Sequence, residues 1–231
     1  MDKLVKFYNA KKVYKYGCHP DSLHSKALNF INGSNRILEV GCADGYIGRV
    51  LKQKDNVVYG IEISSTMGAK AKKVLDKVYI GNIETDTFPL QKKYFDVILL
   101  MDVLEHLFDP LAVLKKLQNY LKDEGIIIIT LPNIGNWEII YNLLRGHFDY
   151  KEEGILDEGH LRFFTYDTAK NLIKKAKLDT LSIDFVSTMP LVLLKIRNRF
   201  PFLGIDKLIR LNYKLFAYQF VFVVRKHQNK R

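Results

Sequence analysis

Two acidic side chains flank a glycine turn near the start of the chain. Residues 37–45 read ILEVGCADG, an apolar run that enters a turn between Gly41 and Gly45. Glycine lets the backbone approach a ligand closely. Glu62 ends the next apolar run, 21 positions after Gly41, about where an acid meets ribose hydroxyls in nucleotide-binding folds. The pattern therefore predicts a nucleoside site.

The residues within the turn indicate which nucleoside it binds. A dinucleotide turn has a second glycine where this chain has Ala43, and it seats a pyrophosphate at the start of the helix. Here the flanking residues are Glu39 and Asp44, whose negative charges would repel a pyrophosphate. Such acids favour a ligand that carries an amino group and a sulfonium.

Taken together, Glu39, Gly41, Gly45 and Glu62 resemble motifs I and II of the class I S-adenosylmethionine (SAM) dependent methyltransferases. Three further segments are similar to the same family: GNIE at 81–84, FDVI followed by DVLEH at 95–106, and LKDEG at 121–125. The resemblance covers roughly residues 33–132. It implies SAM as cofactor, with S-adenosylhomocysteine as its product.

The resemblance also implies roles for single residues. Two positions depart from the family pattern: Ala43 replaces a commoner glycine, and Asn82 stands where aspartate is frequent. The implied cofactor contacts are Glu39 and Gly41 near the methionine amino group, Glu62 on the ribose, Asn82 and Ile83 at the adenine, Met101 and Asp102 beside the methionine, and Cys42, Ala43, Gly45 and Ile63 in the turn and strand end.

A second motif, GILDEGHLRFFT at 154–165, lies outside the cofactor half. It resembles a subgroup of bacterial methyltransferases found with surface-polysaccharide and glycolipid biosynthesis. Within the same region, Asn133 and Trp137 are expected to bind the acceptor, because amides and aromatic rings suit a sugar or a flat ring. Arg162 either binds an acidic substrate group through its guanidinium fork or pairs with Asp157 or Glu158.

Methyl transfer to oxygen needs a positioned acceptor and removal of the hydroxyl proton. Histidine is the natural base near neutral pH, and the catalytic candidates are His160, His106 and Asp102. The structural alternatives are a helix-start residue for His106 and a hydrogen bond that holds the surrounding loop for His160. With only two cysteines and no paired Cys/His spacing, the sequence predicts no metal.

These residues need a parallel sheet to position them. Short runs rich in Val and Ile alternate with segments of helical period. The fold expected is a Rossmann-like, seven-stranded, mostly parallel α/β sheet with helices on both faces and an insertion after strand five. The expected strands are 36–40, 57–61, 78–80, 95–100, 125–130, 180–186 and 218–225, and the expected helices are 46–52, 65–75, 110–121 and 166–176, with Ser64 and Asp109 as N-caps and Pro110 at a first helical position.

The chain is expected to form one domain of 231 residues. Its parts are N-terminal cap helices in 1–35, a SAM-binding core in 36–132, an acceptor-side insertion in 133–165, and a helix with two strands in 166–231. Neither a signal peptide nor a membrane span is recognised, so a cytoplasmic protein is expected.

Thirty-six basic against 25 acidic residues give a net charge of +11, which favours anionic partners. Nucleic acid is not expected, because the Asn/Asp-Pro-Pro-aromatic motif that grips an exocyclic amine is missing after strand four. Residues 191–211 mix bulky apolar side chains with cations. They predict contact with an anionic membrane surface, a lid or a subunit contact. The oligomeric state stays open.

The function that the sequence favours is methyl transfer to a hydroxyl of a small-molecule acceptor: a sugar, a glycolipid or a lipid-linked precursor. A quinone or other aromatic acceptor is the alternative, since the segment 102–106 also resembles ubiquinone-pathway methyltransferases. A SAM-binding scaffold without catalysis is the alternative from another class.

Overall fold

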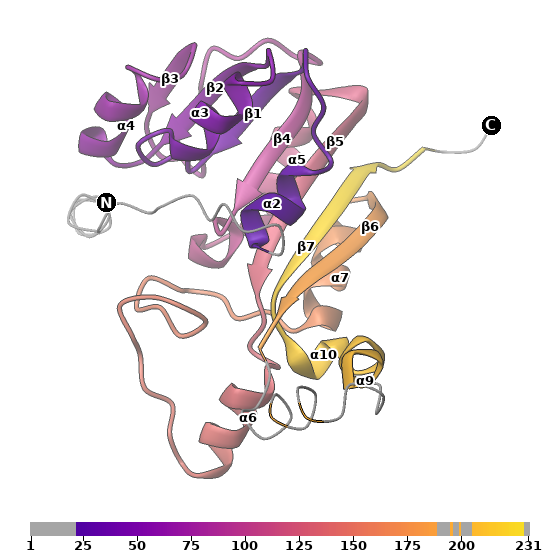
Figure 1. Ribbon diagram of the computed structural model, residues 1–231. Helices are drawn as coiled ribbons and strands as arrows, with labels where there is room; N and C mark the ends of the chain where they lie inside the picture. The colour runs from indigo at the N-terminus through magenta and orange to yellow at the C-terminus, as the bar shows by residue number, and fades with distance from the viewer. Residues whose placement is uncertain (1–21, 189–194, 196–198, 200–204, 229–231) are drawn as a thin grey trace.

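The computed structural model describes residues 22–188, 195, 199 and 205–228, and seven strands within them form one sheet (Figure 1). The strand order is β3-β2-β1-β4-β5-β7-β6. The first four neighbouring pairs are parallel, whereas β7 runs antiparallel to both β5 and β6. The strands are β1 Arg36–Val40, β2 Val57–Glu62, β3 Lys77–Ile80, β4 Phe95–Met101, β5 Leu121–Pro132, β6 Leu178–Ser187 and β7 Ala217–Lys226.

Short helices connect and cover these strands. Five of the described helices begin at side chains that cap them, among them Ser64, which accepts a hydrogen bond from the Met67 amide, Asp109, which accepts from the Ala112 amide, and Thr165, which forms a capping box. The helices are α2 Leu23–Leu28, α3 Tyr46–Lys52, α4 Ser65–Ala71, the 3₁₀ turn η1 Leu104–His106, α5 Pro110–Gln118, α6 Trp137–Leu144, α7 Tyr166–Lys175, α9 Ile205–Leu211 and α10 Tyr213–Phe216.

The core lies in two layers, one on each face of the sheet. Leu114 and Ile173, from α5 and α7, pack on one face, and Ala27 and Ile47, from α2 and α3, pack on the other. Neighbouring residues of a strand belong to opposite layers. The central strands are therefore apolar along their whole length because both of their faces are covered.

The expected fold is confirmed: a seven-stranded, mostly parallel sheet with helices on both faces. Most element ends lie within two residues of the expected bounds, and two places differ by more. Leu121 begins β5 rather than ending α5, because it pairs with Phe95 across the sheet. The helix expected over 65–75 ends at Ala71 and continues as turns.

Some expected features fall outside the described residues. Of the expected cap helices in 1–35, α2 lies in the described part, and residues 1–21 are not described. Most of the segment 191–204 within the basic apolar region 191–211 is likewise outside the described residues. Among the residues that are described, no helix has the length and apolar character needed to cross a bilayer.

The parallel strands β1, β2 and β4 end at the same edge of the sheet, next to the segment 133–165 that follows β5. Figure 1 shows this segment as a long excursion beyond the sheet, with α6 at its far end. Ligands of open α/β sheets bind at the carboxyl ends of the strands, so this edge is where a site is sought.

Candidate functional site

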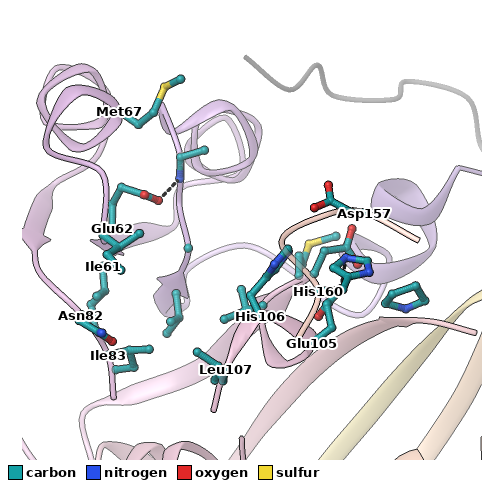
Figure 2. A pocket seen from close by; sticks show the side chains of 18 of the residues that line it. Ile61, Glu62, Met67, Asn82, Ile83, Glu105, His106, Leu107, Asp157 and His160 are labelled. Carbon is teal, nitrogen blue, oxygen red and sulfur yellow. Dashed lines mark hydrogen bonds and ion pairs between the residues drawn. The ribbon is translucent and has the colours of Figure 1, made fainter. Parts of the chain in front are cut away.

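A cavity opens at the carboxyl edge of the sheet. Its walls come from the loops after β1, β2, β3 and β4, from η1, and from the loop 153–160 of the insertion. Figure 2 shows two groups of side chains along it: Glu62, Asn82 and Ile83 on one side, and the pair His106 and His160 on the other. The first group contains expected cofactor contacts, and the second contains the two histidines expected as catalytic candidates.

The glycine turn gives the cavity a backbone wall. The amides of Gly41 and Cys42 both donate to the carbonyl oxygen of Ile61, at 2.8 and 3.2 Å, so the turn is fastened to β2. Gly41, Ala43 and Gly45 all have positive φ angles of 73°, 48° and 83°. Glycine adopts this conformation without strain, whereas alanine does not. Gly41 and Ala43 line the cavity, while Gly45 and the buried Cys42 lie behind it.

Glu62, the expected ribose ligand, lines the cavity at the end of β2. Its Oε2 accepts a hydrogen bond from the Ala43 amide, the dashed line at Glu62 in Figure 2, and its Oε1 accepts one from the Ser64 amide, both at 2.8 Å. Burial raises the pKa of this carboxyl, and the amides of Ser64, Ala43 and Ile63 oppose the rise. Two carboxylate oxygens offer about four acceptor positions, so Glu62 can still accept from ribose hydroxyls.

Glu39 lies behind the turn rather than among the lining residues. Its side chain is buried, and its Oε2 makes no hydrogen bond within the described part of the chain. Burial, with the neighbouring charges of Glu62 and Asp44, raises the pKa of Glu39 to about 8. The same burial and the charges of Glu39 and Glu62 raise the pKa of the Cys42 thiol, which makes Cys42 a packing residue rather than a nucleophile.

The residues expected at the adenine form the next part of the wall. Asn82 uses its side-chain oxygen to accept from the Glu84 amide at 2.8 Å, which fixes the loop after β3. Ile83 is buried and lines the cavity, as do Met67 and Leu107. Apolar side chains around a fixed polar loop are what a flat base requires. Ile63 and Met101 also line the cavity.

Asp102 follows β4 in a left-handed conformation, with φ 54°. Its Oδ1 accepts from the Thr130 hydroxyl at 2.6 Å and from the Gln219 amide at 2.9 Å. Thr130 lies in β5 and Gln219 in β7, so two neighbouring strands hold this carboxylate in place. Strained backbone of this kind is concentrated at functional sites.

The two histidines come together from distant parts of the sequence. His106 ends η1, and its Nδ1 donates to the carbonyl oxygen of Gly159 at 2.8 Å. The Nδ1 of His160 donates to the carbonyl oxygen of Ile155 at 2.9 Å. The ring centroids of the two histidines are 4.7 Å apart. The two expected catalytic histidines therefore lie side by side. Each ring also makes a hydrogen bond to the backbone of the insertion, which is the structural alternative expected for His160.

Glu105 joins the histidines at the cavity wall, although the sequence analysis gave it no role. Its side chain is fully buried, and its Oε1 lies 4.0 Å from Nε2 of His160. The amides of Leu161 and Arg162 both donate to the Glu105 carbonyl oxygen at 2.9 Å. The motifs at 102–106 and 154–165 therefore form one unit.

Negative charge dominates the lining of the cavity, although the whole chain is strongly basic. The described lining residues include no lysine or arginine. Their carboxylates are Asp44, Glu62, Glu84, Asp102, Glu105, Glu153 and Asp157. Opposite charges attract more strongly where water is excluded. The cavity therefore fits a ligand that carries positive charge, as the ammonium and sulfonium groups of SAM do.

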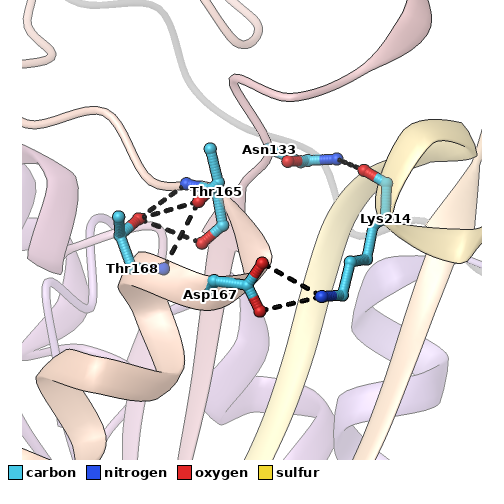
Figure 3. Close-up of polar contacts among 5 residues, drawn as sticks. All are labelled: Asn133, Thr165, Asp167, Thr168 and Lys214. Carbon is cyan, nitrogen blue, oxygen red and sulfur yellow. Dashed lines mark hydrogen bonds and ion pairs between the residues drawn. The ribbon is translucent and has the colours of Figure 1, made fainter.

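The three residues expected to bind the acceptor do not line the cavity. Asn133 is fully buried and donates to the carbonyl oxygens of Lys214 and Ala217, which ties the end of β5 to α10 (Figure 3). Trp137 packs beside Ile209 and Phe216. Arg162 donates to the Phe108 carbonyl oxygen at 2.6 Å. Their positions support structural roles and not direct contact with an acceptor.

Sequence reasoning missed several lining residues. Glu105 could have been found, because it precedes His106 within a motif that the sequence already singled out. Gln219 carried no such signal, since it reaches Asp102 only through the pairing of β7 with β5. Other lining residues without an assigned role include Met67, Leu107, Glu153, Gly154 and Asp157.

The order of strands and the site at their carboxyl ends define the fold of the class I methyltransferases. A family model described as "Methyltransferase domain" matches residues 14–183. The chain belongs to this family.

A solved structure shares the fold of this chain, and two curated proteins are similar to it in sequence. A SAM-dependent methyltransferase structure from Archaeoglobus fulgidus superimposes with a TM-score of 0.62 at 18% identity, over 87% of this chain and 90% of that one. A protein-L-isoaspartate O-methyltransferase from Shewanella sediminis is 31% identical over 52% of this chain and 49% of its own length. A ubiquinone biosynthesis O-methyltransferase from Rhodopseudomonas palustris is 29% identical over 52% and 48%. The chain thus spans about half the length of these curated relatives.

Proposed function

We propose that this protein transfers a methyl group from SAM to a hydroxyl of a small-molecule acceptor. The observation that carries the proposal is the arrangement of one cavity: Glu62, Ile83 and Asp102 are among its walls, and His106 and His160 lie together elsewhere along it. Bound SAM would supply an electrophilic methyl group on a positively charged sulfur.

The protein's own residues would bind and orient both reactants. Glu62 would accept from the ribose hydroxyls, and Ile83 would pack on the adenine. The carboxylates of Glu39 and Asp44 would stabilise the ammonium group across the turn. Asp102, held by two neighbouring strands, would line the methionine side next to the acceptor. A base at His160 or His106 would take the hydroxyl proton as the new bond forms.

The acceptor proposed is a sugar, a glycolipid or a lipid-linked precursor. The motif at 154–165 supports it through resemblance. The aromatic cluster of Phe148, Tyr150 and Phe163, next to His160, supports it physically. Phe148 and Tyr150 are 39% and 54% exposed, so their rings remain open to a ligand. Aromatic faces of this kind suit the apolar face of a sugar ring.

An aromatic hydroxyl is the second candidate acceptor. It is favoured by the similarity to the ubiquinone biosynthesis O-methyltransferase reported above. The same aromatic cluster would stack on a flat ring, so the surface itself does not separate the two candidates.

The proposal includes peripheral contact with an anionic membrane surface. The described helix α6 exposes Tyr141, Leu143 and Leu144, the last at 83%. Trp137 of α6 packs against the region of α9 and α10, where Lys207 and Arg210 are exposed. Apolar side chains beside cations are typical of helices that lie on anionic lipid. The protein would then bind a lipid-linked acceptor at the membrane surface that holds it.

The test is turnover with a panel of acceptors. The purified chain is incubated with SAM and either methyl glycosides or catechol, and S-adenosylhomocysteine is quantified. We expect transfer to one class of acceptor and a loss of at least a hundredfold in Asp102→Ala, with Glu124→Ala as an exposed control. A wild-type protein that binds SAM yet methylates no acceptor would support the scaffold alternative.

A further inference from the structure

We propose that Glu105, His106 and His160 form a binding site for a divalent transition-metal cation at the acceptor side of the cavity. Each residue offers one ligand atom, and the three atoms lie within 4.8 Å of one another. Two imidazoles and one carboxylate are a ligand set that binds zinc, iron and related cations. Sequence spacing did not reveal this set, because His160 comes from the insertion, far along the chain.

Both histidines are already oriented as metal ligands usually are. A backbone carbonyl can only accept a hydrogen bond, so the contacts to Gly159 and Ile155 require a hydrogen on Nδ1 of each ring. In the neutral ring the lone pair then belongs to Nε2. Metal-binding histidines commonly donate their other nitrogen to a backbone carbonyl in this way, which fixes the tautomer and the ring orientation.

The third ligand is a carboxylate whose burial makes its negative charge unfavourable in free energy. The Glu105 side chain is fully buried, its Oε1 lies 4.0 Å from Nε2 of His160, and the cavity lining to which it belongs also contains the acids Asp102 and Asp157. A buried carboxylate needs positive charge nearby to offset its lost hydration. A divalent cation between Glu105 and the two imidazoles would supply that charge.

The backbone holds the three residues on a common frame. Glu105 and His106 are consecutive in η1. The chain around His160 is held against η1 by hydrogen bonds from the Leu161 and Arg162 amides to the Glu105 carbonyl oxygen. The His160 amide donates to the Asp157 carbonyl oxygen at 2.9 Å. Metal bonds of about 2.1 Å place neighbouring ligand atoms about 3 Å apart. The Glu105 torsions and small rotations of the rings must therefore close the remaining gap.

The ligand chemistry selects the cation. Imidazole nitrogen suits zinc, iron and related transition metals, whereas magnesium, calcium and manganese prefer oxygen ligands. Three protein ligands leave coordination positions for an acceptor oxygen. The catalytic role of the cation rests on the proposed methyl transfer but replaces its histidine base: with both imidazoles bound to the cation, the cation itself would lower the pKa of an acceptor hydroxyl, whose proton leaves to solvent. That oxygen would bond to the methyl carbon as the carbon–sulfur bond of SAM breaks.

The experiment measures metal binding directly, without turnover. The full chain, without an affinity tag and stripped with a chelator, is titrated with Co²⁺ by calorimetry and visible absorption. Zn²⁺, Mn²⁺ and Mg²⁺ follow in competition. We expect one Co²⁺ per chain, displaced by Zn²⁺ and not by equimolar Mg²⁺. Affinity should fall at least tenfold in Glu105→Gln and in His160→Gln, and it should be unchanged in His147→Gln, a control at an exposed histidine.

Two results would overturn the proposal: no stoichiometric Co²⁺ binding by the wild-type chain, or equal binding by the wild type and both ligand variants. The wild-type titration does not depend on whether the variants fold. A chain that binds Co²⁺ through these residues but methylates nothing would refute the proposed function and leave the metal site standing. A chain that methylates an acceptor without binding any cation would refute the metal site and leave the proposed function standing.

Discussion

The imidazole Nδ1 of His106 donates to the carbonyl oxygen of Gly159 across 53 residues of sequence, at 2.8 Å. The bond joins the turn after β4 to the insertion that follows β5. Two motifs that appear separate in the sequence are therefore one structural unit. Since η1 also contributes to the cavity wall, the position of the insertion and the shape of the acceptor side depend on each other.

Replacing Glu62 should weaken the binding of SAM. We expect Glu62→Ala to reduce the affinity measured by calorimetry at least tenfold, because the ribose hydroxyls lose their acceptor and the Ala43 and Ser64 amides lose theirs. Glu124→Ala, at an exposed position, is the control. An unchanged affinity would show that the ribose binds elsewhere.

The glycine turn permits a matched pair of substitutions. In Gly41→Ala the new Cβ would meet Val103 Cγ2 at 2.8 Å, at a φ of 73° that alanine tolerates poorly. We expect destabilisation of about 2–3 kcal/mol in urea unfolding. In Ala43→Gly the strain at φ 48° is relieved while the unfolded chain gains freedom, so the stability should change by less than about 1 kcal/mol. Equal losses in both variants would refute this account.

The cofactor half could be predicted from the sequence because its determinants are local. The spacing from Gly41 to Glu62 spans one strand, one turn and one helix, and the order of neighbouring parallel strands follows from right-handed crossovers. The caps at Ser64 and Asp109 were predictable for the same reason, since a cap acts over three residues.

The acceptor half could not be predicted to the same depth, because its geometry depends on long-range pairing. Asn133 and Trp137 looked like ligands by residue type, yet the return of the chain through α9 and α10 turns them into packing residues. Gln219 reaches the site only because β7 runs antiparallel between β5 and β6. No spacing within the sequence encodes such contacts.

The exposed end of α6 gives a prediction about membrane contact. Leu144 is 83% exposed, so Leu144→Asp should leave the Tm within about 2 °C of the wild type. If α6 rests on lipid, the same change should reduce flotation with vesicles that contain anionic lipid at least threefold. Lys175→Gln on α7, which also lowers the net charge by one, is the control for the change of charge alone. Equal flotation of Leu144→Asp and the wild type would exclude α6 from the contact.

Glu39 gives a prediction about pH. Its pKa is raised to about 8 in the folded protein from an ordinary value of 4.5, so between these pH values the folded chain holds a proton that the unfolded chain has released. The stabilisation from that proton is complete below about pH 4.5, and it is lost as the pH rises toward 8. Glutamine resembles the protonated carboxyl at every pH. In the absence of SAM, Glu39→Gln should therefore melt close to the wild type at pH 5.

At pH 8.5 we expect the Glu39→Gln variant to melt about 5 °C above the wild type, because only the wild type then carries a buried negative charge. Saturating SAM should reverse this order, since its ammonium group would stabilise ionised Glu39 and the variant would bind SAM more weakly. Thermal melts of both proteins from pH 5 to 9, with and without SAM, measure both effects, and Glu124→Gln serves as the exposed control. A difference in Tm that does not vary with pH would show that Glu39 stays ionised in the folded chain, held by a positive group other than the cofactor.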